Sequence, residues 1–202
     1  IYVGCPVVYK PAFQELCGHK VTGTAVDNRG ACTALVEIAR QLKETPPSCD
    51  VYLVGTVWEE FNLRGAMMAA RTVKPDLAIV FEGCPADDTV AEPYMIQTAI
   101  HKGPMLRHID ARMITNPRFQ RYALDLAEEL GIPVQESVRT GGSTNGAPIH
   151  LSNQGVPVIV IGIPVRYIHT HYGIAAHSDV ENAARLAAAI LERMDAAQIS
   201  RF

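Results

Sequence analysis

Apolar runs along the chain alternate with segments in which apolar residues recur at helical spacing. Three runs have the length and composition of buried strands: 51–57, 76–81 and 156–163. A shorter run, 134–138, predicts a further strand. The helical pattern covers residues 31–42, 66–71, 118–130, 147–153 and 179–197. Strands that alternate with helices predict an α/β fold, a mostly parallel sheet with helices on both faces.

Turn and cap residues agree with these bounds. Pro46-Pro47 ends the first helix, and Asn116-Pro117 opens the 118–130 helix, which Gly131 closes. Ser178 or Asp179 is expected to cap the last helix. Residues 98–107 are expected to form a loop or an edge strand, and residues 1–21 short strands broken by glycine and proline.

Charged residues follow the ends of the predicted strands. Glu59 and Glu60 come after the 51–57 run, Glu82 ends the 76–81 run, His169 follows the 156–163 run, and Asp27 precedes the first helix. In an α/β sheet, such ends meet at the rim where ligands bind. Taken singly, each residue has an ordinary explanation as a solvated acid, a helix cap or a surface histidine. Together, four carboxylates and a histidine on one rim point to divalent metal ions.

Composition narrows the possible functions. With 202 residues, 48% hydrophobic and 19% charged, the chain can build one sizeable domain with a core. A net charge of −3 gives no basic surface for nucleic acid. No apolar run approaches membrane-span length and no signal peptide is evident, so no membrane association is expected. Five cysteines without a Cys-x-x-Cys pair favour reduced thiols and a cytoplasmic location.

Five segments resemble the M42 family of metallo-aminopeptidases, of the glutamyl and deblocking aminopeptidase type, some members of which are named cellulase or endoglucanase. They are GTAVDNRGA, GTVWEEFNLRGA, KGPMLRHIDARMITNP, GGSTNGAPIHLSNQGVPVIVIGIPVRYIHT and DVENAARL. The similarity runs in consistent order along nearly the whole chain. It implies a zinc-exopeptidase-like catalytic domain at residues 21–202, without its N-terminal part. Residues 1–20 would be the end of an inserted β-barrel or PDZ-like dimerisation domain.

The resemblance also implies a role for each residue of the predicted rim. Asp27 looks like the carboxylate that bridges two metal ions, and Glu59 like the general base that takes a proton from metal-bound water. Glu60 looks like a ligand of one ion. Glu82 matches a ligand of the other ion, where the family typically has Asp. His169 looks like the ligand that completes the site with Asp27 and Glu60.

The implied activity is hydrolysis of N-terminal residues from peptides, with two divalent ions per subunit and a bridging water. Zinc or cobalt is expected, with manganese as an alternative. Gly142, Ser143 and Asn145, in a glycine-rich turn whose N–H groups can face a substrate oxygen, are expected to bind the peptide. The family also implies a large homo-oligomer, a dodecamer of dimers. Two alternatives stay open: another co-catalytic metal hydrolase such as a deacylase, and a non-catalytic homologue that binds peptides or assembles.

The sequence departs from the family pattern at several positions. The family's first metal ligand is a histidine in a His-x-Asp motif, and no such motif precedes Asp27. We therefore expect the second metal position to be incomplete and this chain to show little activity. Glu82 replaces Asp, and Asn145-Gly146 stands where the family often has Asp-Ala. His171 is either an extra ligand or a solvated loop histidine.

Two more residues of a family-like segment, Asp110 and Arg112, carry no predicted chemical role. An intramolecular ion pair or a subunit contact is the expectation for them.

Overall fold

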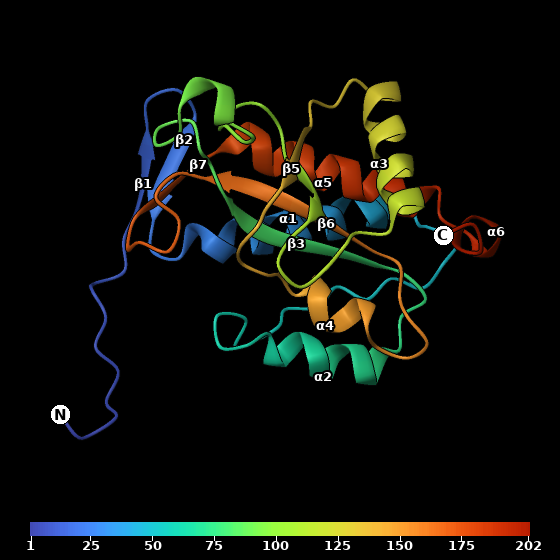
Figure 1. Ribbon diagram of the computed structural model, residues 1–202, viewed down its shortest axis with the longest axis horizontal. Helices are drawn as coiled ribbons and strands as arrows, with labels where there is room; N and C mark the ends of the chain where they lie inside the picture. Colours follow the sequence, from blue (N-terminus) through green and yellow to red (C-terminus); the bar gives the residue numbers. More distant parts are fainter.

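The computed structural model describes residues 1–202 as a layered α/β arrangement (Figure 1). Its strands are β1 (Phe13–Leu16), β2 (Lys20–Gly23), β3 (Ala78–Pro85), β4 (Met105–Ile109), β5 (Gln135–Val138), β6 (Val158–Val165) and β7 (Gly173–Ala176). Its helices are α1 (Val26–Glu44), α2 (Arg64–Val73), η1 (Pro93–Met95, a single 3₁₀ turn), α3 (Pro117–Glu129), α4 (Gly146–His150), α5 (His177–Glu192) and α6 (Ala196–Ile199).

The main sheet has four strands in the order β3-β6-β4-β5. β3 pairs with β6 in parallel, as β4 does with β5, and the two pairs join through an antiparallel contact between β4 and β6. A second, antiparallel sheet joins β1, β2 and β7. β2 spans the expected domain boundary at residues 20–21, and the boundary itself stays a prediction.

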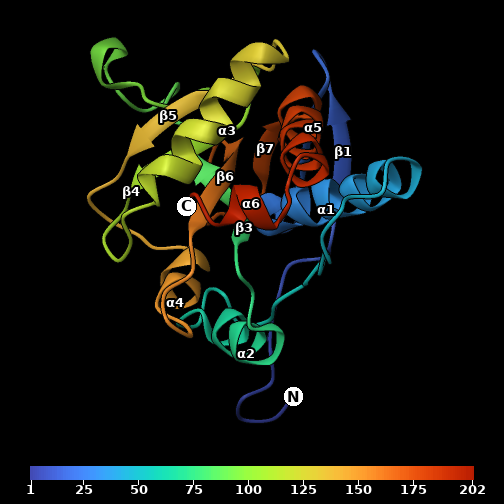
Figure 2. The ribbon, with the colours of Figure 1, turned by 90° about the vertical axis from the view of Figure 1, so that its right-hand side faces the viewer.

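Helices cover both faces of the main sheet, as predicted. The eight residues of β6 are all buried, and their side chains alternate between two clusters. Ile159, Ile161 and Ile163 pack in the larger cluster with α1, α3 and α5. Val158 and Val160 pack in a smaller cluster with Leu63 and Ala147, on the side of α2 and α4. Figures 1 and 2 show α2 and α4 together on the opposite side of the sheet from α3 and α5.

The predicted strand at 51–57 is wrong. Residues 51–56 form no backbone–backbone hydrogen bonds, and the apolar side chains of Tyr52, Val54 and Val57 are exposed. A strand exists only where a neighbouring strand pairs with its N–H and C=O groups, and no strand pairs with this segment. The apolar composition that suggested a strand does not supply that partner.

β3 continues beyond the predicted end at Phe81 to Pro85. Glu82 therefore lies inside the strand, opposite Gly162, instead of at its end. Residues 98–104 form a loop, as expected, but residues 105–107 belong to β4, which is an interior strand and not an edge strand.

The C-terminal helix is shorter than predicted. α5 ends at Glu192, and Asp195 caps a separate short helix, α6, by accepting the N–H of Gln198 at 2.7 Å. Neither Ser178 nor Asp179 caps α5, whose N-cap is Ala176. Asp179 is buried and accepts N–H groups of His101 and Gly103 at 2.8 and 2.9 Å instead.

The expectation of an intramolecular role for Asp110 is met. Its carboxylate accepts the backbone N–H groups of Arg112 and Met113 at 2.9 and 3.0 Å and forms a buried ion pair with Arg107 at 3.5 Å. The Arg112 side chain reaches Asn62 at 3.3 Å. No helix of the structure combines the length and the apolar character that a membrane span requires.

Candidate metal centre

Asp27 stands at the first turn of α1. Its φ of −87° and ψ of 103° are not helical, so the regular helix begins only after Asn28. The carboxylate lies against the backbone of Gly83 on β3, where an added Cβ would be 2.5 Å from Oδ1. Glycine at position 83 therefore gives the Asp27 side chain its space.

Glu59 and Glu60 lie in the loop before α2. The loop is closed by backbone hydrogen bonds from Leu63 N to Glu59 O at 2.9 Å and from Gly65 N to Val57 O at 3.0 Å. Leu63 is buried and anchors the loop against the sheet. The Glu60 carboxylate is exposed, whereas Glu59 is partly buried.

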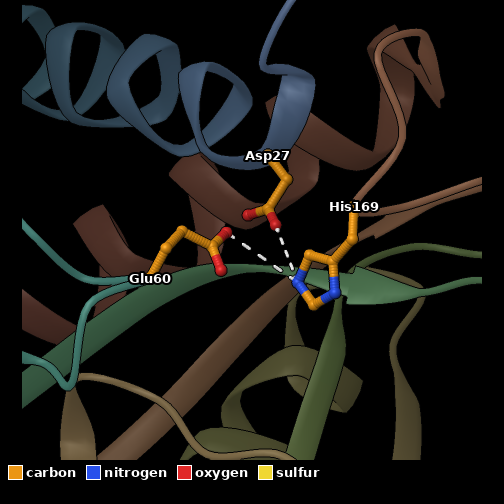
Figure 3. A group of neighbouring side chains, drawn as sticks. All are labelled: Asp27, Glu60 and His169. Carbon is orange, nitrogen blue, oxygen red and sulfur yellow. Dashed lines mark ion pairs between the residues drawn. The ribbon is translucent and has the colours of Figure 1, made fainter. Parts of the chain in front are cut away.

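His169 lies in the turn between β6 and β7 and has a φ of 60°, in the left-handed region. Its Nε2 is 3.6 Å from Asp27 Oδ2 and 3.8 Å from Glu60 Oε1 (Figure 3). Ligand atoms of these three residues lie within 4.8 Å of one another. The structure thus brings together side chains that are far apart in the sequence, with a spacing that leaves room for a cation between them.

Glu82 adjoins this cluster without belonging to it. Its side chain is 4% exposed, its Oε1 accepts the Asn145 N–H at 2.7 Å, and its Oε2 accepts from Asn28 Nδ2 at 3.4 Å. Glu59 and Asp27 are close enough to act on it electrostatically. The predicted rim residues therefore form one acidic site, with Glu82 at its buried side.

The acidic groups raise one another's pKa values. Burial, and then the charges of Glu60 and Asp27, raise the pKa of Glu59 to about 7. Burial raises the pKa of Glu82 to about 8, against the opposing hydrogen bond from Asn145. Burial and the charge of Glu60 also raise the pKa of Asp27, which His169 lowers in part. Such crowding of carboxylates favours either protons or cations.

A cavity of about 370 Å³ opens beside the cluster, lined among others by Asp27, Glu60 and His169. His171 also lines it, but its ring packs between Tyr9 and Tyr172, with ring centroids 4.6 and 4.5 Å away. His171 is not in the three-residue cluster. Its Nε2 is buried and has no hydrogen-bond partner.

The glycine-rich turn reaches the site through Asn145. The backbone N–H of Asn145 binds Glu82, and its side-chain amide lies 3.4 Å from Thr56 Oγ1. Ser143 Oγ and Asn145 Oδ1 are buried without hydrogen-bond partners, and Gly142 has a φ of 72°. These are acceptor and donor groups that a bound molecule can satisfy.

Sequence reasoning missed Asn28 and Gly83. Asn28 donates to Glu82 and to Phe81 O, the latter at 3.0 Å, and Gly83 admits the Asp27 carboxylate. Their positions directly after Asp27 and Glu82 were the available signal.

Comparison with known proteins gives consistent matches. A model of the M42 glutamyl aminopeptidase family matches residues 1–186. The lysyl aminopeptidase of Pyrococcus furiosus is 32% identical over 188 residues, which cover 92% of this chain and 52% of that protein.

Two solved peptidase structures are also similar to this chain. The TET aminopeptidase of the marine sediment archaeon Thaumarchaeota archaeon SCGC AB-539-E09 has a TM-score of 0.91 at 35% identity, over 95% of this chain and 55% of that chain. The Pyrococcus horikoshii TET1 peptidase, which can assemble into a tetrahedron or a large octahedral shell, has a TM-score of 0.82 at 25% identity, over 93% of this chain and 54% of that chain. The chain spans about half the length of the relatives it matches.

Proposed function

Because the chain belongs to the M42 glutamyl aminopeptidase family, we propose that it contributes the catalytic site of an enzyme that hydrolyses N-terminal residues from peptides. The observation that carries the proposal is the cluster of Asp27, Glu60 and His169, whose ligand atoms lie within 4.8 Å of one another. These residues belong to the segments that resemble the family.

The donor set fits a divalent ion. Two carboxylates and an imidazole are ligands that zinc accepts, and cobalt and manganese also bind such groups. No lysine or arginine forms an ion pair with Asp27, Glu59 or Glu60, and the His169 imidazole lies 3.6 and 3.8 Å from the carboxylates of Asp27 and Glu60. Asp27, Glu60 and His169 would hold one ion. Asp27 and Glu82 would contribute to a second, whose family histidine has no counterpart before Asp27 in this chain.

Divalent ions in such a site lower the pKa of water and polarise the scissile carbonyl. Glu59 would act as the general base, because its partly buried carboxylate lies close enough to Asp27 and Glu60 to interact with their charges. It would accept the proton of the attacking water and pass it to the leaving amine. The acidic surroundings would attract a free substrate amine, which favours cleavage at the N-terminus.

The glycine-rich turn would hold the peptide. Ser143 Oγ and Asn145 Oδ1 are buried and unpaired, so a peptide backbone can complete their hydrogen bonds. Gly142 would keep this turn open to the substrate through its positive φ.

The proposal also includes an oligomeric state and a cellular location. We expect a homo-oligomer, in line with the tetrahedron or octahedral shell described for the TET1 peptidase of P. horikoshii. We also expect a cytoplasmic protein, because the five cysteines include no Cys-x-x-Cys pair. Residues 1–20 would be the end of an inserted dimerisation domain and residues 21–202 part of the catalytic domain.

The test measures zinc and cobalt content together with hydrolysis of aminoacyl-nitroanilides. It uses the 202-residue chain and a form extended to the length of the relatives. In the extended form, Glu59→Gln should abolish hydrolysis while keeping the metal, and His169→Ala should lose both. Release of acyl groups from N-acyl amino acids, without aminopeptidase activity, would indicate a deacylase. Peptide binding without hydrolysis would indicate a non-catalytic homologue.

A further inference from the structure

Two consecutive aspartates directly beyond β3 each bind one arginine through two hydrogen bonds. Asp87 accepts hydrogen bonds from Arg139 Nη1 and Nη2, both at 2.9 Å. Asp88 accepts hydrogen bonds from Arg166 Nε at 2.9 Å and Nη2 at 2.7 Å. Paired contacts of this kind fix the orientation of both partners. The end of β3, the strand that carries Glu82, is therefore tied to two other parts of the chain.

Each arginine stands at the entrance to a loop of the candidate site. Arg166 follows β6 and leads into the turn that carries His169. Arg139 follows β5 and leads into the glycine-rich turn, which reaches Glu82 through Asn145. Asp87 and Asp88, consecutive residues after β3, thus each bind the arginine at the start of one of these loops.

The turn that carries His169 has few other hydrogen bonds, although Ile168 packs against the core and the His171 ring contacts two tyrosines. Tyr167 and His169 both have positive φ values, 57° and 60°, which side chains rarely adopt. The hydrogen bonds of Thr170 go to Tyr167 within the same turn. The hydrogen bonds that tie the turn to the rest of the protein start at Arg166, through Asp88 and through the backbone of Ile174.

The ion pairs are largely shielded from water. Their side chains are 12–27% exposed, in contrast to the pair of Arg193 and Glu129, which has the same two-bond form but is 44% and 59% exposed. Burial opposes ionisation of Asp87, yet the hydrogen bond and charge of Arg139 hold its pKa below the usual value. Arg139 also donates to Thr98 Oγ1 at 2.6 Å and to Pro85 O at 3.3 Å.

We propose that Asp88 is a positioning residue for the metal centre and Asp87 a positioning residue for the glycine-rich turn beside it. Asp88 acts through Arg166 and sets the place of the His169 imidazole. Asp87 acts through Arg139 and keeps the glycine-rich turn, and with it Asn145, against Glu82. This inference rests on the proposed function, because it gives these residues a purpose only if His169 binds a metal ion.

The experiment compares zinc affinity by titration calorimetry and backbone hydrogen exchange by mass spectrometry. Asp88→Asn keeps the size of the side chain and removes its charge. We expect about a tenfold loss of zinc affinity, the effect typical of residues that orient a ligand, and faster exchange at 166–173. Asp87→Asn should speed exchange at 139–146 and change zinc affinity by less than about twofold, since Asp27, Glu60 and His169 stay in place.

Further variants separate positioning from general damage. Glu129→Gln breaks the exposed Arg193 pair and should change neither readout. Asp88→Glu keeps the charge and should retain more zinc affinity than Asp88→Asn. If Asp88→Asn does not fold, Arg166→Lys, which removes the two-bond contact with Asp88 but keeps the positive charge, decides, and wild-type affinity together with unchanged exchange at 166–173 overturns the inference.

The outcomes also distinguish this inference from the proposed function. Wild-type chain that binds zinc, with Asp88→Asn binding equally well, overturns the positioning role alone. Wild-type chain that binds no divalent ion overturns the metal centre and the positioning role together. Zinc binding that is lost in His169→Ala and weakened in Asp88→Asn supports both.

Discussion

Replacement of Glu82 by glutamine should remove much of the pH dependence of stability in the metal-free chain. Glu82 is 4% exposed and lies inside β3, and burial raises its pKa from 4.5 to about 8. Glutamine has nearly the shape of the protonated acid and still accepts the N–H of Asn145. Unlike Glu82, it does not titrate.

The sign of the pH dependence of stability follows from the number of protons bound in the folded and unfolded states. Between the two pKa values, the folded chain keeps a proton on Glu82 that the unfolded chain has released, so stability falls as pH rises. The stabilisation is fully present below about pH 4.5 and is lost by about pH 8. At about 1.4 kcal/mol for each pKa unit, the upper limit of this contribution is about 5 kcal/mol.

The assay is urea unfolding in the presence of EDTA from pH 5 to 8.5. The free energy of unfolding of the wild-type chain should decrease by several kcal/mol over this range, and that of Glu82→Gln by clearly less. Some slope should remain, because the pKa of Glu59 is also raised, to about 7. Glu181→Gln, which changes an exposed glutamate on α5, is the matched control and should follow the wild-type curve.

Parallel stability curves for wild type and Glu82→Gln would refute this reasoning. They would mean that Glu82 ionises in the folded chain as easily as in the unfolded chain, and that Asn145 or water solvates its charge. A curve for Glu181→Gln as flat as that for Glu82→Gln would also contradict it, because the effect would then not be specific to the buried position.

Three further predictions concern the core, a helix cap and the space around Asp27. Phe119→Ala should lower the free energy of unfolding by about 3–5 kcal/mol in urea titrations, because the ring is fully buried, and a loss below about 1 kcal/mol would contradict the packing. Asn116→Ala should cost about 1 kcal/mol in the same assay, since Asn116 accepts two N–H groups of α3, and unchanged stability would argue against this cap. Gly83→Ala should weaken zinc binding by about tenfold or more in calorimetry, because its Cβ would displace the Asp27 carboxylate, and wild-type affinity would be inconsistent with the close contact.

Local sequence patterns predicted the elements that are stabilised by residues close to one another in the sequence. The 118–130 helix is present as α3, with Asn116 as its cap and Gly131 just beyond its end. The apolar run at 156–163 is present as β6, the most buried strand. Helix periodicity and caps involve residues a few positions apart, so the sequence displays them directly.

The acidic residues of the site were also visible in the sequence, because carboxylates after apolar runs stand out. The arrangement of these residues relative to one another was not visible in the sequence. Glu82 was expected at the end of a strand, yet it lies buried within β3, since the length of β3 depends on its pairing with β6. The tie of Asp87 and Asp88 to Arg139 and Arg166 spans 52 and 78 positions, and no local pattern displays it.

The sequence by itself determined the alternation of strands and helices, the cap of α3, and which acids and histidine are candidates for a metal centre. Tertiary structure alone decided which apolar runs find a strand partner, how deeply each carboxylate is buried, and which arginine each aspartate binds. Residues 51–56 show the difference, because their composition suits a strand but their N–H and C=O groups form no backbone–backbone hydrogen bonds. Pairing, burial and the pKa values that follow from them depend on residues far apart in the chain, and these meet only in the folded protein.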